Sequence, residues 1–222
     1  MEPGKNSWIN LDKATKGNKE GPISLPDIPI VLLSGDYLSL APNTLVLGQV
    51  IDTLFFRLAT HQFKKGIRTY VLPSSLFDRV SEDLSYETIL PGVCQDINFI
   101  VSASFYRNHW SLVLIDKSEK KIYYLDPLSV YVPVAKKDKD IKVINRIIWY
   151  YLENNDISTE VPSTIENWVV VETSTFEKVN LEKIPKQTGG VDCGIYTVIY
   201  ISRSSISPEM IWRRSEIGAT IS

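Results

Sequence analysis

Apolar residues between positions 46 and 63 repeat at the spacing of one face of a helix. That face comprises Val50, Ile51, Leu54, Phe55 and Leu58. Asn43 and Thr44 come just before it, and both have side chains that commonly cap a helix N-terminus. The pattern predicts an amphipathic helix over residues 46–63, with these two residues available as caps.

The middle of the chain has the composition of β-strands. Residues 96–101, 110–116 and 121–126 are rich in β-branched and aromatic side chains. Only the polar residues 117–120 (KSEK) separate the last two segments, which is the length of a hairpin connection. We therefore expect three strands, of which the last two pair antiparallel.

Two further apolar runs, residues 28–33 and 168–171, also predict strands. The first run is closed by Ser34, Gly35 and Asp36, and an acid-flanked run of this type could instead be a modifier-binding peptide. Its β-branched residues favour the strand.

The C-terminal half contains two more apolar segments. Residues 141–152 have apolar positions three and four apart, which predicts a helix packed on a core. The run CGIYTVIYI, residues 193–201, is rich in β-branched residues and on propensity alone favours a strand. The order of helix, strands, helix, strand and a final apolar segment indicates an α+β domain.

The composition is that of an ordinary globular protein: 44% hydrophobic, 23% charged and a net charge of −2 over 222 residues. We expect a leader at residues 1–22, which are polar and lack apolar periodicity, and a single domain over residues 23–222. There is no basic excess typical of a nucleic-acid binder, and no apolar run of membrane-spanning length. We therefore expect an intracellular monomer that binds neither nucleic acid nor membrane.

The chain contains only two cysteines, Cys94 and Cys193, and two histidines, His61 and His109. They form no closely spaced pair of the kind found in zinc sites, so we expect no metal and no cofactor. The two cysteines could form one disulfide, although an intracellular location favours free thiols. His61 near the end of the first helix is interpreted as a solvated or capping residue.

A cysteine nucleophile requires three aids, namely a base, a group that orients the base and an oxyanion donor, and the chain offers a candidate for the nucleophile and for each aid. Cys193 follows a glycine-containing turn and could begin a helix, whose N-terminus favours a thiolate. His109 starts one predicted strand and Asp126 ends its partner, so a hairpin would bring them together. Gln187 could fold back toward Cys193 as an oxyanion donor.

Each of these residues, taken singly, is better explained by an ordinary structural role. A lone cysteine in an apolar run is commonly an inert core residue, a histidine before a tryptophan can simply be packed, and Asp-Pro after a strand is a common turn. The catalytic interpretation depends on their occurring together.

Together the motifs resemble a known family. They are NHWSLVLID from Asn108, YYLDP ending at Pro127, and Gln187 followed by Asp192-Cys193-Gly194. This combination is similar to the signature of the Ulp/SENP-type ubiquitin-like-protein-specific cysteine peptidases, whose elements follow the order His, Asp, Gln, Cys. The intervals of 17 residues from histidine to aspartate and 6 from glutamine to cysteine also agree. The resemblance extends more weakly from residue 36 to residue 200.

The resemblance implies a papain-like fold with a central, mostly antiparallel sheet flanked by helices, and with Cys193 at the start of a buried helix. It implies Cys193 as nucleophile, His109 as base, Asp126 as orienter and Gln187 as oxyanion donor. The expected partner is SUMO, ubiquitin or a related modifier, cleaved after a C-terminal Gly-Gly. Trp110 would be one wall of a narrow tunnel through which only residues without side chains pass.

The resemblance also places Leu45, Gly190 and Asp192 among the substrate-contacting positions, while Cys94 is interpreted as structural. Leu45 departs from the family pattern, because a second tunnel tryptophan is expected there. Three alternatives therefore stay open: an adenain-like or transposon-type protease that cuts other sequences, an acyltransferase on the same scaffold, and an inactive module that binds a modifier.

Overall fold

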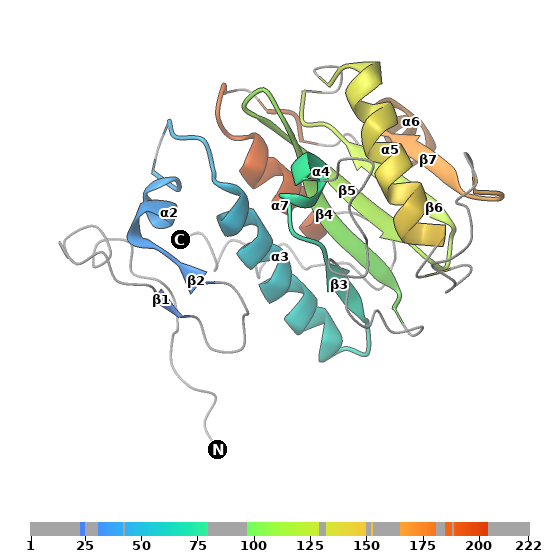
Figure 1. Ribbon diagram of the computed structural model, residues 1–222, viewed down its shortest axis with the longest axis horizontal. Coiled ribbons are helices and arrows are strands. Elements are labelled where there is room, and N and C mark those ends of the chain that lie inside the picture. Colours follow the sequence, from blue (N-terminus) through green and yellow to red (C-terminus); the bar gives the residue numbers. More distant parts are fainter. Residues whose placement is uncertain are drawn as a thin grey trace.

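A five-stranded sheet forms the centre of this computed structural model, with strand order β3-β4-β5-β6-β7 (Figure 1). The structure describes residues 23–24, 31–41, 43–79, 97–128, 132–149, 152, 165–180, 185–187 and 189–203. In these ranges no helix is long and apolar enough to cross a membrane.

The three strands predicted in the middle of the chain form the antiparallel centre of this sheet, although the first, predicted at residues 96–101, begins at Phe99 and continues to Tyr106. They are β4 (Phe99–Tyr106), β5 (His109–Asp116) and β6 (Lys121–Leu125), and β5 pairs antiparallel with both neighbours. The two outer strands, β3 (Thr69–Val71) and β7 (Val169–Glu172), each pair parallel with the strand beside them. The sheet is therefore mixed, antiparallel in the middle and parallel at both edges.

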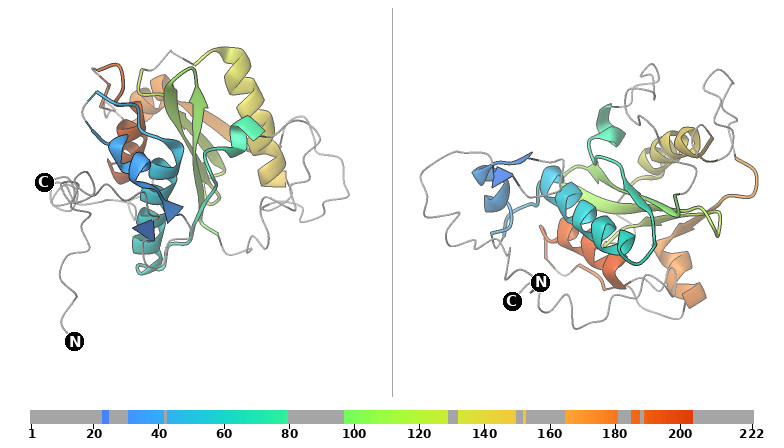
Figure 2. Two further views of the ribbon diagram at one scale, coloured as in Figure 1. Left: turned by 60° about the vertical axis from the view of Figure 1, so that its left-hand side comes forward. Right: turned by 90° about the horizontal axis from the view of Figure 1, so that it is seen from below.

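Helices cover both faces of the sheet, as the edge-on view in Figure 2 shows. On one face lie α3 (Gly48–Phe63) and α7 (Cys193–Arg203), which contact each other. On the other face lies α5 (Val134–Ile148). Three shorter helices are also described: α2 (Ser34–Leu38), α4 (Leu76–Arg79) and α6 (Thr173–Asn180).

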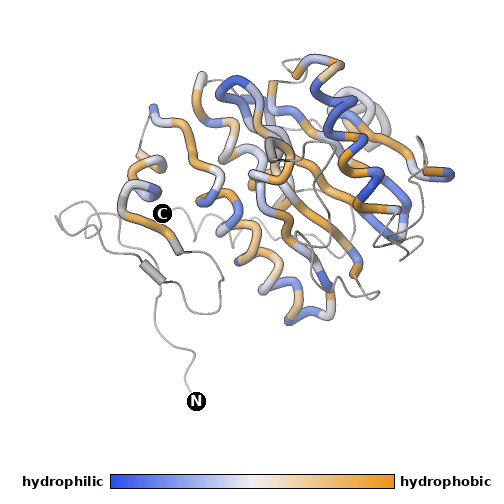
Figure 3. Tube along the Cα trace, in the orientation of Figure 1, coloured by the Kyte–Doolittle hydropathy of each residue, from blue (hydrophilic) through white to orange (hydrophobic). Residues whose placement is uncertain are grey.

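Two hydrophobic clusters separate these layers. Alternate residues of β5 point to opposite faces, so Leu112 and Leu114 join the cluster with α3 and α7, and Val113 and Ile115 join the cluster with α5. In Figure 3 the central strands are mostly hydrophobic, while α5 alternates between hydrophobic and hydrophilic residues. A sheet buried on both faces needs such nearly continuous apolar strands.

The predicted first helix is confirmed, but its predicted caps are wrong. The N-cap of α3 is Leu47, which makes no side-chain capping bond. Thr44 instead donates its hydroxyl to the carbonyl of Ser39 at 2.9 Å, and Asn43 adopts a positive φ of 62°. Both residues thus belong to the turn between α2 and α3, where asparagine tolerates the left-handed backbone conformation.

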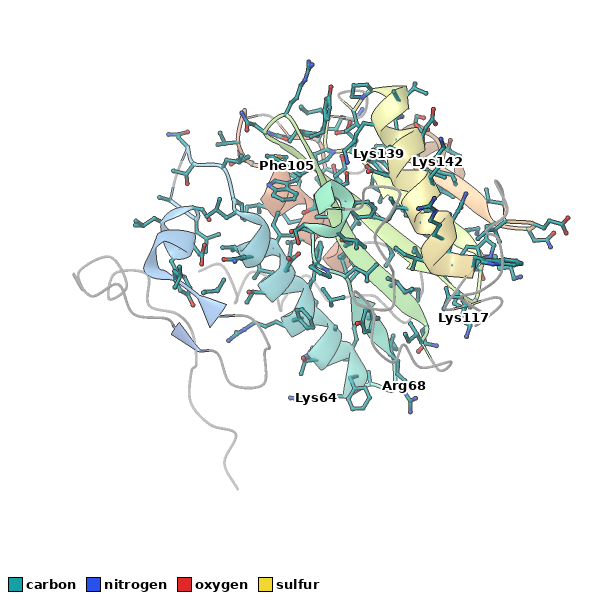
Figure 4. The ribbon with its side chains drawn as sticks, viewed as in Figure 1. Lys64, Arg68, Phe105, Lys117, Lys139 and Lys142 are labelled. Carbon is teal, nitrogen blue, oxygen red and sulfur yellow. The ribbon has the colours of Figure 1, made fainter. Side chains whose placement is uncertain are left out.

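The helix predicted at residues 141–152 begins earlier, since α5 starts at Val134. Its first two turns are polar and mostly exposed, so they lack the apolar repeat on which the prediction depended. In Figure 4 Lys139 and Lys142 are drawn on this helix. The predicted strand at 28–33 is described only as β2 (Val31–Leu32), which pairs antiparallel with β1 (Ile23–Ser24). Residues 28–30, residues 1–22 and Cys94 lie outside the described residues.

The apolar run after residue 193 forms a helix, α7, and not the strand that propensity alone favours. Its core-facing residues Tyr200 and Ile201 are each 3% exposed. The hydroxyl of Thr197, a β-branched residue in the middle of the run, donates to the carbonyl of Gly194 at 2.7 Å. Packing on the sheet and on α3 therefore outweighs the modest strand preference of these residues.

Candidate active site

His109 is placed by a tight turn between β4 and β5. The two turn residues, Arg107 and Asn108, have positive φ angles of 46° and 64°, as in the two-residue turns whose twist matches that of paired strands. Tyr106 pairs with His109 across the turn. His109 is therefore the first residue of β5, at the end of the sheet, and it is buried.

Asp126 immediately follows β6, the strand next to β5, and its carboxylate is 2.6 Å from Nε2 of His109. The same carboxylate accepts bonds from the backbone N–H of Leu128 at 2.8 Å and of Val132 at 3.3 Å. The backbone of Asp126 is held in turn by Thr173, whose hydroxyl oxygen accepts from the Asp126 N–H at 2.8 Å. The predicted proximity of the His109 and Asp126 side chains is therefore confirmed.

His109 and Asp126 each stabilise the charged form of the other. Burial alone would lower the pKa of His109, yet hydrogen bonds to Asp126 and to Cys193 outweigh it and raise that pKa from 6.5 to about 9. Burial alone would raise the pKa of Asp126, but the bonds from His109 and from the two backbone N–H groups hold it below its usual value. The geometry thus favours an imidazolium beside a carboxylate.

Cys193 is the first residue of α7, and its thiol is free and fully buried. Its Sγ lies 3.9 Å from the carbonyl oxygen of Asn108, the turn residue before His109. Nε2 of His109 faces Asp126, and Cys193 lies close enough to the imidazole to raise the pKa of His109 through a side-chain hydrogen bond. The sulfur, imidazole and carboxylate therefore form a continuous row.

Gln187 lies in a segment that is hydrogen-bonded both to the residue after Asp126 and to α7, the helix that begins with Cys193. Its backbone N–H donates to the carbonyl of Pro127 at 3.2 Å, next to Asp126. The hydroxyl of Tyr200 in α7 donates to the carbonyl of Pro185 at 2.9 Å. The Gln187 side chain is buried; its Nε2 donates to the Gly189 carbonyl, and its Oε1 has no hydrogen-bond partner among the described residues.

Trp110 lies beside this row and is 6% exposed. Its indole N–H donates to the carbonyl of Val46 at 2.8 Å, and its ring centroid is 4.4 Å from that of Phe105. Figure 4 labels Phe105 at the end of the sheet near α7. Leu45, next to Val46, is half-buried and packs against the same cluster. The predicted tunnel residues thus lie near one another, with only a small part of the indole exposed.

The remaining predicted residues differ in their surroundings. Gly190 and Asp192 are exposed just before α7, and the carbonyl of Asp192 accepts from the Tyr196 N–H at 3.1 Å in the first turn of the helix. His61 lies in the last turn of α3 and is half-buried. At a rise of 1.5 Å per residue, His61 lies roughly 20 Å along α3 from Gly48, the first residue of that helix. Among the described residues no group of three or more His, Cys, Asp or Glu could hold a metal ion.

Sequence reasoning missed Thr173 and the carbonyl of Asn108. Thr173 holds Asp126 from 47 residues away, and no local pattern indicates that contact. Asn108 has a local signal, because asparagine immediately before a strand is typical of a tight hairpin turn. That turn brings its carbonyl to the thiol of Cys193.

A thiol hydrogen-bonded to an imidazole, itself held by a buried carboxylate, can attack a carbonyl carbon. The start of α7 adds backbone N–H groups that have no partner within the helix and can stabilise negative charge. Covalent acyl transfer through sulfur is therefore the chemistry that this arrangement can perform.

Comparison with known proteins adds a family match. A model described as the Ulp1 protease family, C-terminal catalytic domain, matches residues 96–209. The chain is 26% identical over 118 residues to ubiquitin-like-specific protease 1D of Arabidopsis thaliana, covering 50% of this chain and 19% of the relative. It is 25% identical over 93 residues to protease 1A of the same plant, covering 42% of this chain and 15% of the relative. The chain thus spans about a fifth or less of these relatives.

Solved structures show the same fold. The yeast C-terminal Ulp1 protease domain, solved in complex with Smt3, the yeast ortholog of SUMO, matches with a TM-score of 0.60 at 19% identity. That match covers 86% of this chain and 78% of the other. An Ulp1-like SUMO protease catalytic domain from Chaetomium thermophilum also matches with a TM-score of 0.60 at 19% identity, covering 85% of this chain and 73% of the other. The predicted α+β fold is confirmed as the Ulp1 protease fold.

Proposed function

Because this chain belongs to the Ulp1 protease family of cysteine proteases, we propose that it cleaves ubiquitin-like modifiers after a C-terminal Gly-Gly, with Cys193 as nucleophile. The observation that carries the proposal is the position of His109. It lies between the Asp126 carboxylate, 2.6 Å away, and the Cys193 sulfur to which it is hydrogen-bonded. A base held from both sides in this way is the requirement for activating a thiol.

The reaction begins when the Cys193 sulfur, whose proton has passed to His109, attacks the carbonyl carbon of the scissile bond. The resulting oxyanion accepts hydrogen bonds from the Cys193 N–H and from the Gln187 amide, and the imidazolium of His109 gives its proton to the departing amine nitrogen. The carbon–nitrogen bond breaks and leaves a thioester. His109 then takes a proton from water, which attacks the thioester and releases the modifier's carboxylate and the free thiol. Asp126 keeps the imidazole oriented throughout.

The burial of the thiol favours a substrate whose C-terminal residues have small side chains or none. Cys193 is 0% exposed and His109 is 3% exposed. An extended chain reaches the sulfur only where its residues occupy little space, and glycine, without a side chain, occupies the least. Leu45 is smaller than the tryptophan expected there, so we expect this approach to tolerate more variation than a passage between two indole rings.

A panel of modifier-derived propargyl probes tests this function. SUMO, ubiquitin and related modifiers, each with a C-terminal propargylamide, are incubated with the wild type and with Cys193→Ala. We expect at least one modifier to form a covalent adduct with the wild type and none with the variant, as seen by gel shift and intact mass. Failure of every modifier, with the protein folded, would contradict the proposal and favour cleavage of other sequences or acyl transfer.

The two histidines supply a matched pair for the same assay. His109→Ala should lower the turnover of a responsive modifier substrate by at least about a thousandfold, because removing one member of a catalytic unit removes most of its effect. His61→Ala should remain near the wild type, since His61 lies in the last turn of α3. Retained turnover in His109→Ala would refute the assignment of the base.

A further inference from the structure

Asp52 is a buried carboxylate that the proposed reaction does not use. It lies in α3 and is 6% exposed. Burial raises the pKa of Asp52 to about 6, although hydrogen bonds from Ser74 partly oppose the effect. A charged group out of contact with water is unfavourable unless it is well hydrogen-bonded. The partners of Asp52 therefore indicate which part of the molecule it holds in place.

Within the described part of the chain, this carboxylate accepts its hydrogen bonds from Ser74, in the loop that joins β3 to α4. The Ser74 backbone N–H donates to the two carboxylate oxygens at 3.0 and 3.1 Å. The Ser74 hydroxyl donates to Oδ2 at 3.1 Å. Ser74 is itself 4% exposed. Three bonds to one carboxylate fix both the backbone and the side chain of Ser74.

The Ser74 hydroxyl and the ring of Trp110 both lie close to Gly48. Gly48 is four residues before Asp52, so the two occupy the same face of α3. A Cβ atom on Gly48 would lie 2.5 Å from Ser74 Oγ and 3.1 Å from Cη2 of Trp110. The Ser74 hydroxyl and the far edge of the indole therefore both lie next to the position that a Cβ of residue 48 would occupy. Only glycine at that residue leaves room for both.

The other side of the indole is confined as well. A Cβ atom on Gly194, the residue after Cys193, would lie 3.3 Å from Cδ1 of Trp110. The indole N–H is bound to the carbonyl of Val46 at 2.8 Å. The ring thus lies between the first turns of α3 and α7, and on the α3 side the Ser74 hydroxyl shares the neighbourhood of Gly48 with the edge of the ring.

We propose that Asp52, acting through Ser74, is a positioning residue that fixes the indole of Trp110 where it borders the approach to Cys193. The proposal rests on the proposed function in that Trp110 is taken to contact the modifier's C-terminal residues. Asp52 touches neither the substrate nor the reacting atoms. Its effect is therefore on substrate binding more than on the chemical step.

Fluorine NMR tests the positioning without any substrate. The chain has five tryptophans, and protein labelled with 5-fluorotryptophan allows the Trp110 signal to be assigned by its loss in Trp110→Phe. We expect Asp52→Ala and Ser74→Ala to shift and broaden that signal alone. Asp52→Asn retains an oxygen that can accept from the Ser74 N–H, so its Trp110 signal should stay near that of the wild type.

Steady-state kinetics with a responsive modifier substrate supply the second measurement. We expect KM to rise about tenfold in Asp52→Ala, which corresponds to losing hydrogen bonds to one charged group. We expect kcat to change by less than about twofold, because the carboxylate of Asp52 is bonded to Ser74 and takes no part in the bonds that form and break. Asp52→Asn should recover most of the loss in KM.

Thr53→Val is the matched control. Thr53 is the next residue of α3, is also buried, and donates its hydroxyl to the carbonyl of Gln49 at 2.7 Å within the helix. Thr53→Val should leave the Trp110 signal and KM unchanged. If Asp52→Ala does not fold, Ser74→Ala carries the test, because it keeps the backbone bond.

An unchanged Trp110 signal in folded Asp52→Ala and Ser74→Ala would overturn the proposal, as would an equal change in Thr53→Val. If no modifier probe labels the wild type, the proposed function fails by itself. The fluorine spectra would then still decide whether Asp52 positions Trp110.

Discussion

His109 differs from the other histidine of the chain by the charges placed around it. Nε2 of the ring faces a carboxylate that is anchored by two backbone N–H groups, and the ring also interacts with the side chain of Cys193. These bonds raise the pKa of His109 to about 9, against the opposing effect of burial. The imidazole is therefore protonated at neutral pH and can serve as the acid that gives a proton to the leaving amine.

The pH dependence of activity follows from this pKa. We expect kcat/KM for a responsive modifier to fall as the pH rises through about 9, because His109 then loses the proton that the leaving group requires. In Asp126→Asn the charge that favours the imidazolium is gone, so the midpoint of the fall should move to lower pH. The measurement is kcat/KM from pH 6 to 10.5, with circular dichroism to check that the fold persists.

Equal midpoints in the wild type and in Asp126→Asn would contradict the role of Asp126 in charging His109. A fall centred near pH 6.5 in the wild type would show that the pair does not raise the pKa of His109.

At the scale of elements, the site depends on the close approach of α7 to α3. A Cβ atom on Gly194 would lie 2.9 Å from the Cβ of Val46 and 3.0 Å from Cδ1 of Ile51. Distances this short leave no room for a methyl group between α7 and the segment that leads into α3 and forms its first turn. The second residue of α7 therefore sets how far Cys193 lies from α3 and from the end of β5.

We expect Gly194→Ala to move the start of α7 outward. The variant should lose about 1–3 kcal/mol of unfolding free energy through overpacking, and at least about tenfold in kcat/KM through misplacement of Cys193. Chemical denaturation and turnover of a responsive modifier measure the two effects.

Gly35→Ala is the control for this prediction. Gly35 lies in α2, and nothing lies within 4 Å of the position that its Cβ would occupy. Gly35→Ala should keep wild-type turnover and should be as stable as the wild type or slightly more stable. Similar behaviour of the two alanine variants would show that the approach of α7 to α3 is not tight.

At the scale of the whole molecule, a buried polar cluster joins the layer opposite the thiol to the sheet. Asp140 in α5 is fully buried. Its carboxylate accepts hydrogen bonds from the hydroxyls of Ser104 in β4 at 2.5 Å and of Tyr124 in β6 at 2.9 Å. Lys136, one turn earlier in α5, lies 2.6 Å from the other carboxylate oxygen. One carboxylate thus ties a helix to two strands.

Removal of this carboxylate should destabilise the protein strongly. We expect Asp140→Ala to lower the free energy of unfolding by about 3 kcal/mol, because two buried hydroxyls and a largely buried ammonium lose their partner. Asp138→Ala, at an exposed position of the same helix, should change it by less than about 0.5 kcal/mol. Urea denaturation measures both, and equal stability of the two variants would refute the role given to Asp140.

Much of the fold and the site was predictable from the sequence because the signals were local. The hairpin of β5 and β6 followed from apolar runs around a four-residue polar connection, and it implied the approach of His109 and Asp126. The first helix followed from its apolar repeat. Residues 193–201 were ambiguous, because strand propensity opposed the family resemblance, and packing made them a helix.

Other features depend on contacts between distant segments and left no local signal. The parallel pairing at both sheet edges, the bond of Thr173 to Asp126 and the Asp52–Ser74 pair all join residues that are far apart in the chain. The start of α5 was missed because an exposed polar helix carries no apolar repeat.

The sequence by itself determined which residue types are present and their order, and these identified Cys193, His109, Asp126 and Gln187 as candidates. Periodicity and turn chemistry act over a few residues, so they also determined most strands and the first helix. Only the tertiary structure decided the distances between these residues, the burial of the thiol and the confinement of Trp110 between two helix starts. Packing between distant segments sets those quantities, and close packing is a property of the folded chain as a whole.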